Sequence, residues 1–496
     1  MKSIYTVLFI FLSSILFSFS KNIKWAADAE GNAPYIFQDA NKPGNLIGFE
    51  VDLMKVLGRQ LKLEPIFIQN QWDGLIPGLN RHDYDIAVNG LEITDEREKE
   101  ILFSVPYYIT HLKILVRSNE KYIKNYFLLN GKKVGALKNS LAEKVLRAND
   151  KLKTLTYEGE FNAFEDLKNG RIDAVLADAP IALYYVGWNK SLKILDPEVG
   201  EAKYGIAIRK NQKSLKDSID LALNQIIKNG ELKNILIRWN LWNKQMQDYT
   251  EDYTPSDSAP SMYNYFIESQ LKDVSLEERL TRYIGFMPLI LQAAVLTLNI
   301  SIIAMILAVV FGLFLAIIRI YSPKPLSIIS IMYIEIVRGT PLLIQLFFIF
   351  YALPSIGISL SPFVAAVLGL GLNYAAYEAE NYRAGLNAVP KGQLEAALAL
   401  GLNRRQSLRY IIIPQAFRIV IPPMTNDFIS LLKDSSLVSV ITLVELTKLY
   451  TQLSATYYDY IGTGLIIAAV YLILGLPFVN LSKYFEQKLK NNKFKS

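Results

Sequence analysis

The residues around position 97 are suited to binding a carboxylate group. Thr94 has the side chain of a helix N-cap, so Arg97 should lie in the first turn of the helix that follows. A cation at that end opposes the helix dipole, and an anionic partner would offset this unfavourable interaction. The planar guanidinium also matches a carboxylate with two parallel hydrogen bonds. Arg97 is therefore a candidate carboxylate-binding residue, and the alternative is a surface ion pair with a neighbouring acid, Asp95, Glu96 or Glu100.

Patterns for other kinds of chemistry are weak. The chain has two histidines, His82 and His111, far apart in sequence, and no cysteine. No nucleophile stands beside a base, and there is no Gly-x-x-x-x-Gly-Lys-Ser/Thr loop to hold the phosphates of ATP. Without cysteine, neither a disulfide framework nor a lipid-modified cysteine anchor is available. The sequence therefore predicts no enzyme, no catalytic residue, no metal and no cofactor.

The elements that position Arg97 belong to the first of two parts of the chain. With 496 residues, the chain has room for two or three domains. Residues 21–280 carry charges throughout, as soluble domains do, whereas residues 284–482 contain long uncharged runs. The first part therefore predicts a soluble domain, and the second predicts a membrane domain.

The first twenty residues have the order of a secretory signal peptide. Lys2 precedes an apolar stretch over residues 4–17, and the small residues Ser18 and Ser20 follow it. An apolar core of this length is short for a membrane span. We predict a signal peptide over residues 1–20, with an uncleaved anchor as the alternative. Either one places residues 21–280 outside the cytoplasm.

Residues 22–247 alternate short apolar runs with amphipathic segments. From Glu50 onward, leucines recur every fourth position on one helical face. Such an alternation of strands and helices predicts an α/β fold. The runs with strand character cover residues 113–116, 133–137, 174–176 and 204–208.

Five motifs identify the kind of α/β fold. They are Gly48-Phe-Glu-Val-Asp-Leu53, Trp72-Asp-Gly-Leu-Ile-Pro77, Ile93-Thr-Asp-Glu-Arg97, Phe103-Ser-x-Pro-Tyr107 and Asp173-Ala-Val-Leu-Ala-Asp178. Together they resemble the polar-amino-acid solute-binding proteins, whose two lobes close on a ligand at a hinge. The resemblance implies a type II, two-lobed periplasmic-binding-protein-like domain over residues 21–247. Lobe one would cover residues 22–112 and 205–247, and lobe two residues 113–204.

The resemblance also implies roles for four side chains. A bound amino-acid zwitterion needs a cation for its carboxylate and an anion for its ammonium, and these would be Arg97 and Asp178. Trp72 matches the aromatic residue that stacks on the ligand side chain, with a buried core tryptophan as the alternative. Asp28 matches a position that often contacts the ligand side chain. Because Asp178 precedes Ala179-Pro180 at a predicted helix start, capping of that helix is its alternative role.

Three further positions complete the predicted ligand site. Gly90 allows close approach of the backbone, and the peptide nitrogen of residue 92 would add a donor. Relatives often carry serine or threonine where this chain has Glu92, whose carboxylate would repel a ligand carboxylate unless it points elsewhere. In lobe two, Ser140 begins a capping box, and the amides of its helix would meet the ligand carboxylate. The acids Asp28, Glu30 and Glu92 favour a cationic ligand such as arginine or lysine, while glutamine or another polar amino acid stays equally open.

The second part carries predicted membrane spans. Basic residues beside a span mark the cytoplasmic side, and they occur in the loop 383–409 and in the tail 483–496. An odd number of spans agrees with an extracytoplasmic first part and a cytoplasmic C-terminus. We assign residues 248–284 to a linker and an interfacial lead-in, and residues 285–482 to the membrane domain. The five expected spans lie near 296–318, as two spans within 339–377 joined by an outer loop at 354–361, at 411–432 and at 460–482.

Motifs of this second part resemble the histidine/glutamine type of permease. They are Arg338-Gly-Thr-Pro341, Asn373-Tyr-Ala-Ala-Tyr-Glu378, Pro390-Lys-Gly-Gln-Leu-Glu395 and Lys433-Asp-Ser-Ser-Leu437. The run Glu395, Ala396, Ala397, then Gly401, then Ile411-Ile-Ile-Pro414 resembles the EAA loop of bacterial ABC-importer permeases, where a short cytoplasmic helix docks on an ATPase subunit. An ordinary helix that Gly401 caps is the alternative.

The two resemblances together imply one subunit of a bacterial polar-amino-acid ABC importer in the inner membrane. Its partners would be an L-amino acid, a separate ABC ATPase, the lipid bilayer, and a second permease in a homodimer or heterodimer. The net charge of +7 is attributed to topology, so no nucleic acid is expected. A ligand-gated channel or a chemosensory receptor with the same binding domain is the competing hypothesis, and the EAA loop favours transport over both.

Overall fold

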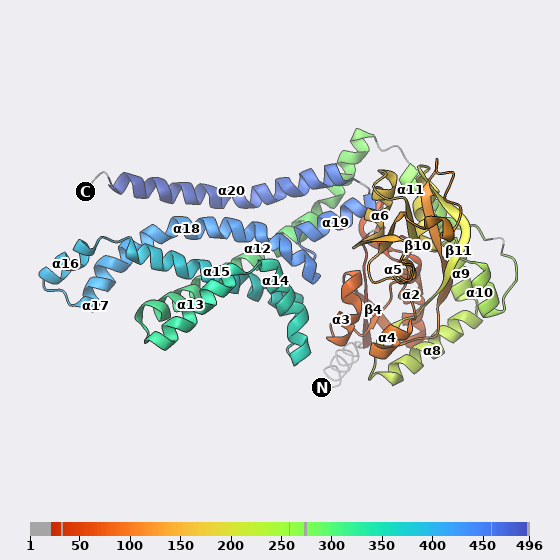
Figure 1. Cartoon of the computed structure of the whole chain (residues 1–496), viewed down its shortest axis with the longest axis horizontal. Coiled ribbons are helices and arrows are strands. Elements are labelled where there is room, and N and C mark those ends of the chain that lie inside the picture. Colours follow the sequence, from red (N-terminus) through yellow and green to blue (C-terminus); the bar gives the residue numbers. More distant parts are fainter. Residues whose placement is uncertain (1–20, 31–32, 257, 272–274, 458, 494–496) are drawn as a thin grey trace, which may run out of the picture. The chain divides into compact units, whose positions relative to one another are not determined.

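The chain divides into two compact units, one of residues 1–41 and 45–272 and one of residues 42–44 and 273–496. The structure is a computed structural model that describes residues 21–30, 33–256, 258–271, 275–457 and 459–493 (Figure 1). The first unit is α/β and the second is built of helices, so the predicted order of fold classes is confirmed. The predicted signal peptide, residues 1–20, lies outside the described residues.

Lobe one of the first unit is built on a five-stranded sheet in the order β4-β1-β5-β12-β6. Strand β1 pairs in parallel with β4 and β5, and β12 is antiparallel to β5 and β6. The helix predicted after Glu50 is α2, Phe49–Leu61, and its Leu53 and Leu57 are fully buried. The strands are β1 Lys21–Ala27, β4 Leu63–Gln69, β5 Ile86–Ala87, β6 Ile101–Phe103 and β12 Ala207–Arg209; the other helices are η1 Trp72–Gly74, α3 Leu75–Asn80, α4 Asp95–Glu100, α8 Lys213–Lys228, α9 Glu231–Arg238 and α10 Lys244–Thr250.

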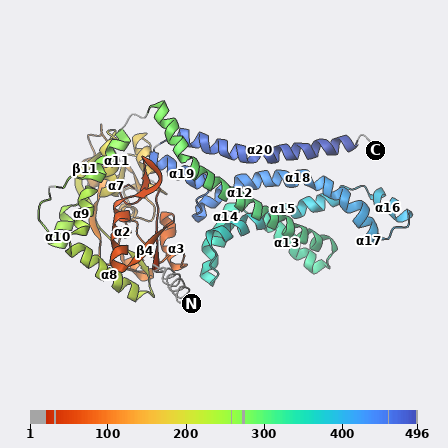
Figure 2. The ribbon, with the colours of Figure 1, turned by 180° about the vertical axis from the view of Figure 1, so that it is seen from behind.

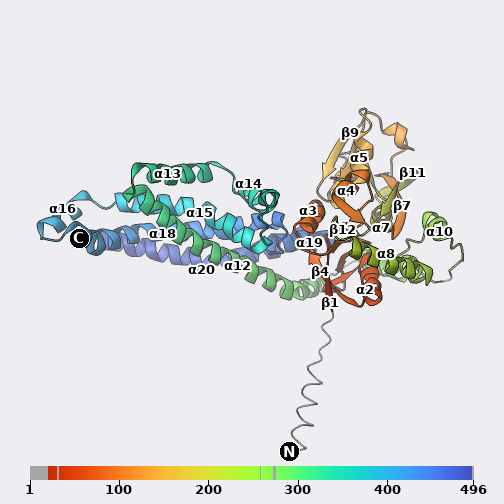
Figure 3. The same ribbon diagram turned by 90° about the horizontal axis from the view of Figure 1, so that it is seen from below.

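Lobe two is built on a second five-stranded sheet in the order β11-β7-β10-β8-β9. Figure 3 shows the two lobes one above the other, with β9 and α5 in the upper lobe and β1 and α2 in the lower one. The buried face of this sheet packs on apolar side chains of α5, among them Ala142 and Leu146. The elements are β7 Tyr108–Arg117, β8 Lys133–Leu137, β9 Lys153–Tyr157, β10 Ala174–Asp178, β11 Leu192–Tyr204, η2 Tyr126–Leu129, α5 Leu141–Arg147, α6 Glu160–Lys168 and α7 Ala179–Trp188. A short ribbon, β2 Phe37–Asp39 and β3 Lys42–Ile47, completes the strands of the described residues.

The chain passes between the lobes at two places. It leaves lobe one after β6 and returns between the end of β11 at Tyr204 and the start of β12 at Ala207. The single strand predicted over 204–208 is therefore two strands in two sheets. The break falls at Gly205, whose amide donates to the carbonyl of Leu91. A Cβ at this position would lie 3.0 Å from the side chains of Ile93 and Phe103, which is tighter than ordinary van der Waals contact.

A helix that the sequence does not predict lies in the segment assigned to the linker. Helix α11, Ser261–Leu271, belongs to the first unit. Its Phe266 is buried, with ring centroids 5.5 Å from Phe37 and 5.0 Å from Tyr184. The hydroxyl of Tyr265 donates to Asp39 over 2.6 Å. Part of the predicted linker is thus a packed helix.

The second unit is a bundle of long helices. Helices α12, α15, α18 and α20 lie side by side, and α13 flanks α12 and α15 (Figures 1 and 3). Apolar side chains of α12, α15 and α18 meet in its core, together with Leu346 and Phe350. The helices are α12 Leu276–Tyr321, α13 Lys324–Gly339, α14 Leu342–Phe347, η3 Phe348–Ala352, η4 Leu353–Ile356, α15 Pro362–Asn387, α16 Lys391–Ala399, α17 Arg404–Ser407, η5 Leu408–Ile412, α18 Ile413–Asp434, η6 Ser435–Ile441, α19 Leu446–Tyr457 and α20 Tyr460–Lys493.

The length and hydropathy of the helices in the described residues identify fewer membrane crossings than the five expected from the sequence. Two helices of the described residues are long and apolar enough to span a bilayer, Glu277–Tyr321 and Tyr460–Phe485. A third crossing results if Lys324–Gly339 and Leu342–Ile356, which meet at 107°, form one bent span. The bend falls at Gly339-Thr-Pro341, where proline cannot continue a helix. The five-span count therefore stays a prediction.

One end of the second unit carries the loop with the Glu-Ala-Ala sequence. Helices α16 and α17 lie at that end, and the C-terminal end of α20 lies there too (Figures 1 and 2). Gly401 follows α16 with a φ of 85°, and its amide donates to the carbonyl of Leu398. This is the backbone of a glycine that ends a helix, so the capping considered as the alternative is present, and it is compatible with a docking helix.

Candidate functional site

Arg97 lies in the first turn of α4, as the sequence predicts. Thr94 caps this helix, and its hydroxyl accepts a hydrogen bond from the Arg97 amide over 3.3 Å. The guanidinium donates to the carboxylate of Glu92 over 2.5 Å and to the carbonyl of Asn139 in lobe two over 2.8 Å. Its carbon lies 5.3 Å from the centroid of the Trp72 ring, a cation–π distance. The ion-pair partner is thus Glu92, rather than the three neighbouring acids considered from the sequence.

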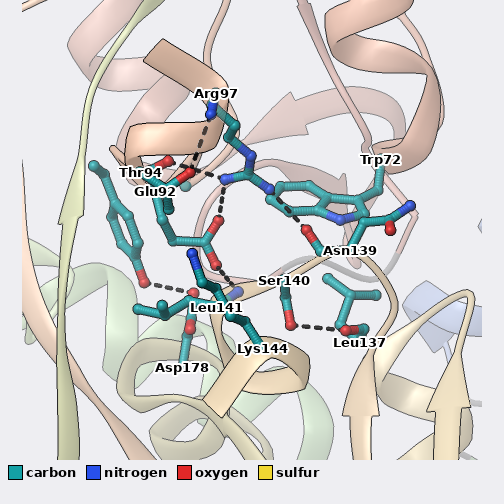
Figure 4. A network of polar contacts seen from close by, with 12 residues as sticks. Trp72, Glu92, Thr94, Arg97, Leu137, Asn139, Ser140, Leu141, Lys144 and Asp178 are labelled. Atoms are coloured by element: carbon teal, nitrogen blue, oxygen red, sulfur yellow. Dashed lines mark hydrogen bonds and ion pairs between the residues drawn. The ribbon is translucent and has the colours of Figure 1, made fainter. Parts of the chain in front are cut away.

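Glu92 lies between the two lobes with both carboxylate oxygens engaged. One oxygen accepts from Arg97, and the other accepts from the amide of Leu141 in lobe two over 2.9 Å (Figure 4). The residue is 1% exposed. Its side chain points toward the guanidinium of Arg97, the residue that the sequence predicts to bind a ligand carboxylate.

Other contacts hold the lobes together on the same side. The indole N–H of Trp72 donates to the carbonyl of Lys138 over 3.0 Å, and the ring is only partly buried. The ammonium of Lys138 lies 3.1 Å from Asp73, and Asn139 donates to the same carboxylate over 3.0 Å. The structure therefore brings Trp72, Glu92 and Arg97 of lobe one together with residues 138–141 of lobe two (Figure 4).

Asp178 lies at the end of β10 and is buried, and its carboxylate makes no capping hydrogen bond to α7. It accepts instead from two tyrosine hydroxyls, that of Tyr204 over 2.5 Å and that of Tyr35 over 3.3 Å. Burial, and then the nearby charge of Glu92, raise the pKa of Asp178 to about 7. Helix capping, the alternative role from the sequence, is absent here.

The remaining predicted residues have other contacts. Asp28 accepts from the amide of Trp72 over 3.0 Å and so fixes the backbone beneath the indole. The N–H of Gly90 donates to the buried carboxylate of Glu50 over 2.6 Å, and the Tyr35 ring lies 2.9 Å from the position of a Cβ there. Ser140 caps α5, with its hydroxyl donating to Leu137 and accepting from the amide of Glu143. Asp28, Gly90 and Ser140 thus support the neighbouring parts of the site.

Sequence reasoning missed one acid of this region. Glu160 is the first residue of α6 and is 8% exposed, and within the described residues no hydrogen-bond donor contacts its carboxylate. Burial raises its pKa well above the ordinary range, and the charges of Asp178, Glu92 and Asp28 raise it further. The sequence gives no signal for this position, because its proximity to Asp178 depends on how α6 packs against β10.

The charges of this region are unbalanced. Asp28, Glu92, Glu160 and Asp178 are all buried, and Arg97 forms an ion pair with one of them, Glu92. The two nearby lysines are paired elsewhere, Lys138 with Asp73 and Glu158, and Lys144 with Glu96. Within the described ranges, no group of three or more histidine or acidic side chains is placed to hold a metal ion.

A second polar region lies in the helical unit. A cavity of about 490 Å³ is lined by Arg338, Asp427 and Asp434 among others. The guanidinium of Arg338 lies over the ring of Tyr377 at 5.3 Å, and the hydroxyl of Tyr374 donates to Asp434 over 2.7 Å. Charged residues at such positions of a membrane protein commonly serve transport.

At the end of this unit, the helix with the Glu-Ala-Ala sequence presents an open surface. Glu395 and Ala396 are exposed on α16, while Ala397 is buried against the rest of the unit. Leu398 and Leu400 are 46% and 83% exposed. Small and apolar residues on an exposed helix favour contact with another protein.

Comparison with known proteins accounts for both units. Residues 23–241 match the bacterial extracellular solute-binding proteins, family 3, and residues 308–491 match the binding-protein-dependent transport system inner membrane component. The chain is 37% identical over 206 residues to the arginine transport system permease protein ArtQ of Bacillus subtilis, covering 41% of this chain and 94% of that protein. It is 40% identical over 206 residues to the L-cystine transport system permease protein TcyB of the same organism, covering 41% and 88%. It is also 32% identical over 209 residues to the ABC transporter arginine-binding protein 1 of Escherichia coli, covering 41% and 85%.

Proposed function

We propose a function that follows from the family: this chain belongs to the binding-protein-dependent inner-membrane transport components and carries a family 3 extracellular solute-binding domain. In this proposal the chain captures a cationic L-amino acid and delivers it to its own membrane unit. The chain is a permease of an amino-acid ABC transporter with a fused binding domain. The alternative of a channel or a chemosensory receptor finds no support among the relatives, which include transport permeases.

The observation that carries the cationic preference is the excess of buried acids at the site. Besides burial, the charge of Glu92 raises the pKa of Asp178, and the charges of Asp178, Glu92 and Asp28 raise the pKa of Glu160. A ligand with a positively charged side chain relieves this like-charge repulsion, whereas the neutral amide of glutamine does not. In the proposed complex Arg97 binds the ligand carboxylate, Asp178 accepts from its ammonium and Trp72 packs on its side chain.

Titration with all twenty amino acids tests this specificity. Isothermal titration of the full chain in lipid nanodiscs should show tighter binding of arginine or lysine than of glutamine. The margin should be about tenfold or more, because a buried charge pair adds more than about 1.4 kcal/mol over a neutral contact. Norleucine, which has the length of lysine without its charge, is the matched control ligand. Tighter binding of glutamine than of both basic amino acids would contradict the proposal.

The affinity should also depend on pH through Asp178. Only the ionised carboxylate can accept a charge-assisted bond from the ligand ammonium, and the pKa of this group is raised to about 7. Below that pH, binding must first remove a proton from Asp178. The affinity is therefore full above pH 7 and should fall as the pH drops, by about tenfold per unit. Titrations between pH 8 and pH 5 measure this slope, and Asp178→Asn should bind weakly with a flat profile. A wild-type affinity that stays constant over this range would exclude the role given to Asp178.

The remaining parts of the transport cycle are proposals of the same kind. We propose that a separate ABC ATPase contacts α16 around Glu395, Ala396 and Ala397, because Glu395 and Ala396 are exposed and the three residues match the EAA loop. The first unit would then lie outside the cytoplasm, and α16 with the C-terminal end of α20 inside it. A second permease copy, in a homodimer within the bilayer, would complete the wall of the pathway.

A further inference from the structure

The carboxylate of Glu92 uses the donors that a ligand carboxylate would need. Arg97 donates to one of its oxygens over 2.5 Å, and the amide of Leu141 donates to the other over 2.9 Å. One donor comes from lobe one and the other from lobe two (Figure 4). At 1% exposure, Glu92 is buried where it accepts from both of these donors.

We propose that Glu92 is an internal competitor for the carboxylate subsite. It bridges the lobes when no ligand occupies the site, and the carboxylate of a ligand binds only by displacing it. This inference rests on the proposed function and deepens it, because it names the residue that sets the preference between ligands with and without a carboxylate.

The surrounding charges make this displacement unfavourable. A displaced Glu92 loses Arg97 and stays among Asp28, Glu160 and Asp178, which are buried acids. In a low-dielectric site an anion without a partner is strongly destabilised. Serine or threonine at this position would instead donate to the ligand carboxylate. Amino acids therefore bind this chain less tightly than they would bind the same site with threonine.

A cation without a carboxylate meets the opposite situation. It leaves the pair of Glu92 and Arg97 intact and gains from the negative charge of Glu92. Specificity is the difference between the binding free energies of two ligands. Glu92 increases this difference in two ways, because it weakens the binding of ligands with a carboxylate and strengthens the binding of cations without one. Glu92 is thus a specificity-determining residue with opposite effects on two ligands.

L-Arginine and agmatine form the matched pair that tests the competition. Agmatine keeps the guanidinium and one amine of arginine but lacks its carboxylate. In the full chain, Glu92→Thr should raise the affinity for arginine by about tenfold or more and should lower that for agmatine. Glu92→Gln, which keeps the shape and removes the charge, should change the ratio of the two affinities in the same direction. Arginine affinity that falls or stays unchanged in Glu92→Thr, or an equal gain for both ligands, would overturn the proposal.

A second measurement reads the bridge between the lobes without any ligand. The chain has no cysteine, so spin labels can be placed uniquely at Asn224→Cys on α8 of lobe one and Lys132→Cys before β8 of lobe two, both exposed positions. Pulsed electron-spin distances in the full chain should shift or broaden in Glu92→Thr relative to the doubly labelled parent. Identical distance distributions would overturn the bridge. If the parent binds no amino acid, the proposed function fails, while a change in these distances would still support Glu92 as the bridge.

Discussion

Replacing Arg97 by alanine is expected to remove most of the affinity for the amino acid. The ligand carboxylate would then lie in a closed site without its charge partner, and truncation of one partner of such a pair costs about 2–5 kcal/mol, or about thirty-fold and more in affinity. Isothermal titration of the full chain against arginine measures the loss. Unchanged binding in Arg97→Ala would place the ligand carboxylate elsewhere.

The same substitution should also reduce stability, and a double variant separates the two effects. Without Arg97, the carboxylate of Glu92 keeps the Leu141 amide but loses its counter-ion in a buried position. Breaking a buried pair in this way costs about 3–5 kcal/mol. Arg97→Ala with Glu92→Thr should therefore recover thermal stability, and it should still bind arginine about thirty-fold or more less tightly than Glu92→Thr alone. A double variant that binds as tightly as Glu92→Thr alone would mean that the affinity loss of Arg97→Ala arises from misfolding.

The second large effect is expected from Ala396→Trp on α16. If α16 docks on an ATPase, an indole on this exposed helix blocks the close approach that a small residue permits. Uptake of arginine into proteoliposomes that contain the chain and its ATPase should fall about tenfold or more, because a clash at the centre of an interface removes most of its affinity. Titration should show unchanged ligand binding, since Ala396 belongs to the other unit.

Two controls make this result specific. Lys483→Trp places the same side chain at an exposed position on α20 and should leave uptake near the wild-type rate. Co-purification of the ATPase with the chain should be lost in Ala396→Trp and retained in the control. Normal uptake with a tryptophan at 396 would show that α16 is not the coupling helix.

Those parts of the ligand site that depend on residues close together in the sequence could be predicted from the sequence. Thr94 and Arg97 are three residues apart, so the cap and the first-turn position follow from local rules. The contacts of Glu92 could not be predicted in this way. Its second donor is the amide of Leu141, 49 residues away in the other lobe, and the distance between them depends on how the lobes close. The place of Glu160 in this region could not be predicted either, because its proximity to Asp178 depends on how α6 packs against β10.

Three features of the fold could not be predicted from the sequence, because the local residue pattern fits more than one structure. Residues 204–208 form an apolar run typical of one strand, but Gly205 marks the passage between two sheets. The run from Gly339 contains the glycine and proline that bend the chain by 107°, yet these residues cannot indicate whether the bent pair crosses the bilayer. Helix α11 has a weak helical pattern, and its docking depends on contacts with residues far away in sequence, those of the buried Phe266 with Phe37 and Tyr184 and that of Tyr265 with Asp39.

The docking of α11 on the first unit also limits how the two activities of the chain can be combined. Helix α11 ends at Leu271 and α12 begins at Leu276, so four residues, 272–275, connect the receptor part to the translocating part. A stretch of that length reaches at most about 14 Å. Each receptor is therefore dedicated to one translocator and cannot be exchanged among neighbours. The number of receptors that this gene product supplies therefore rises only together with the number of translocating parts.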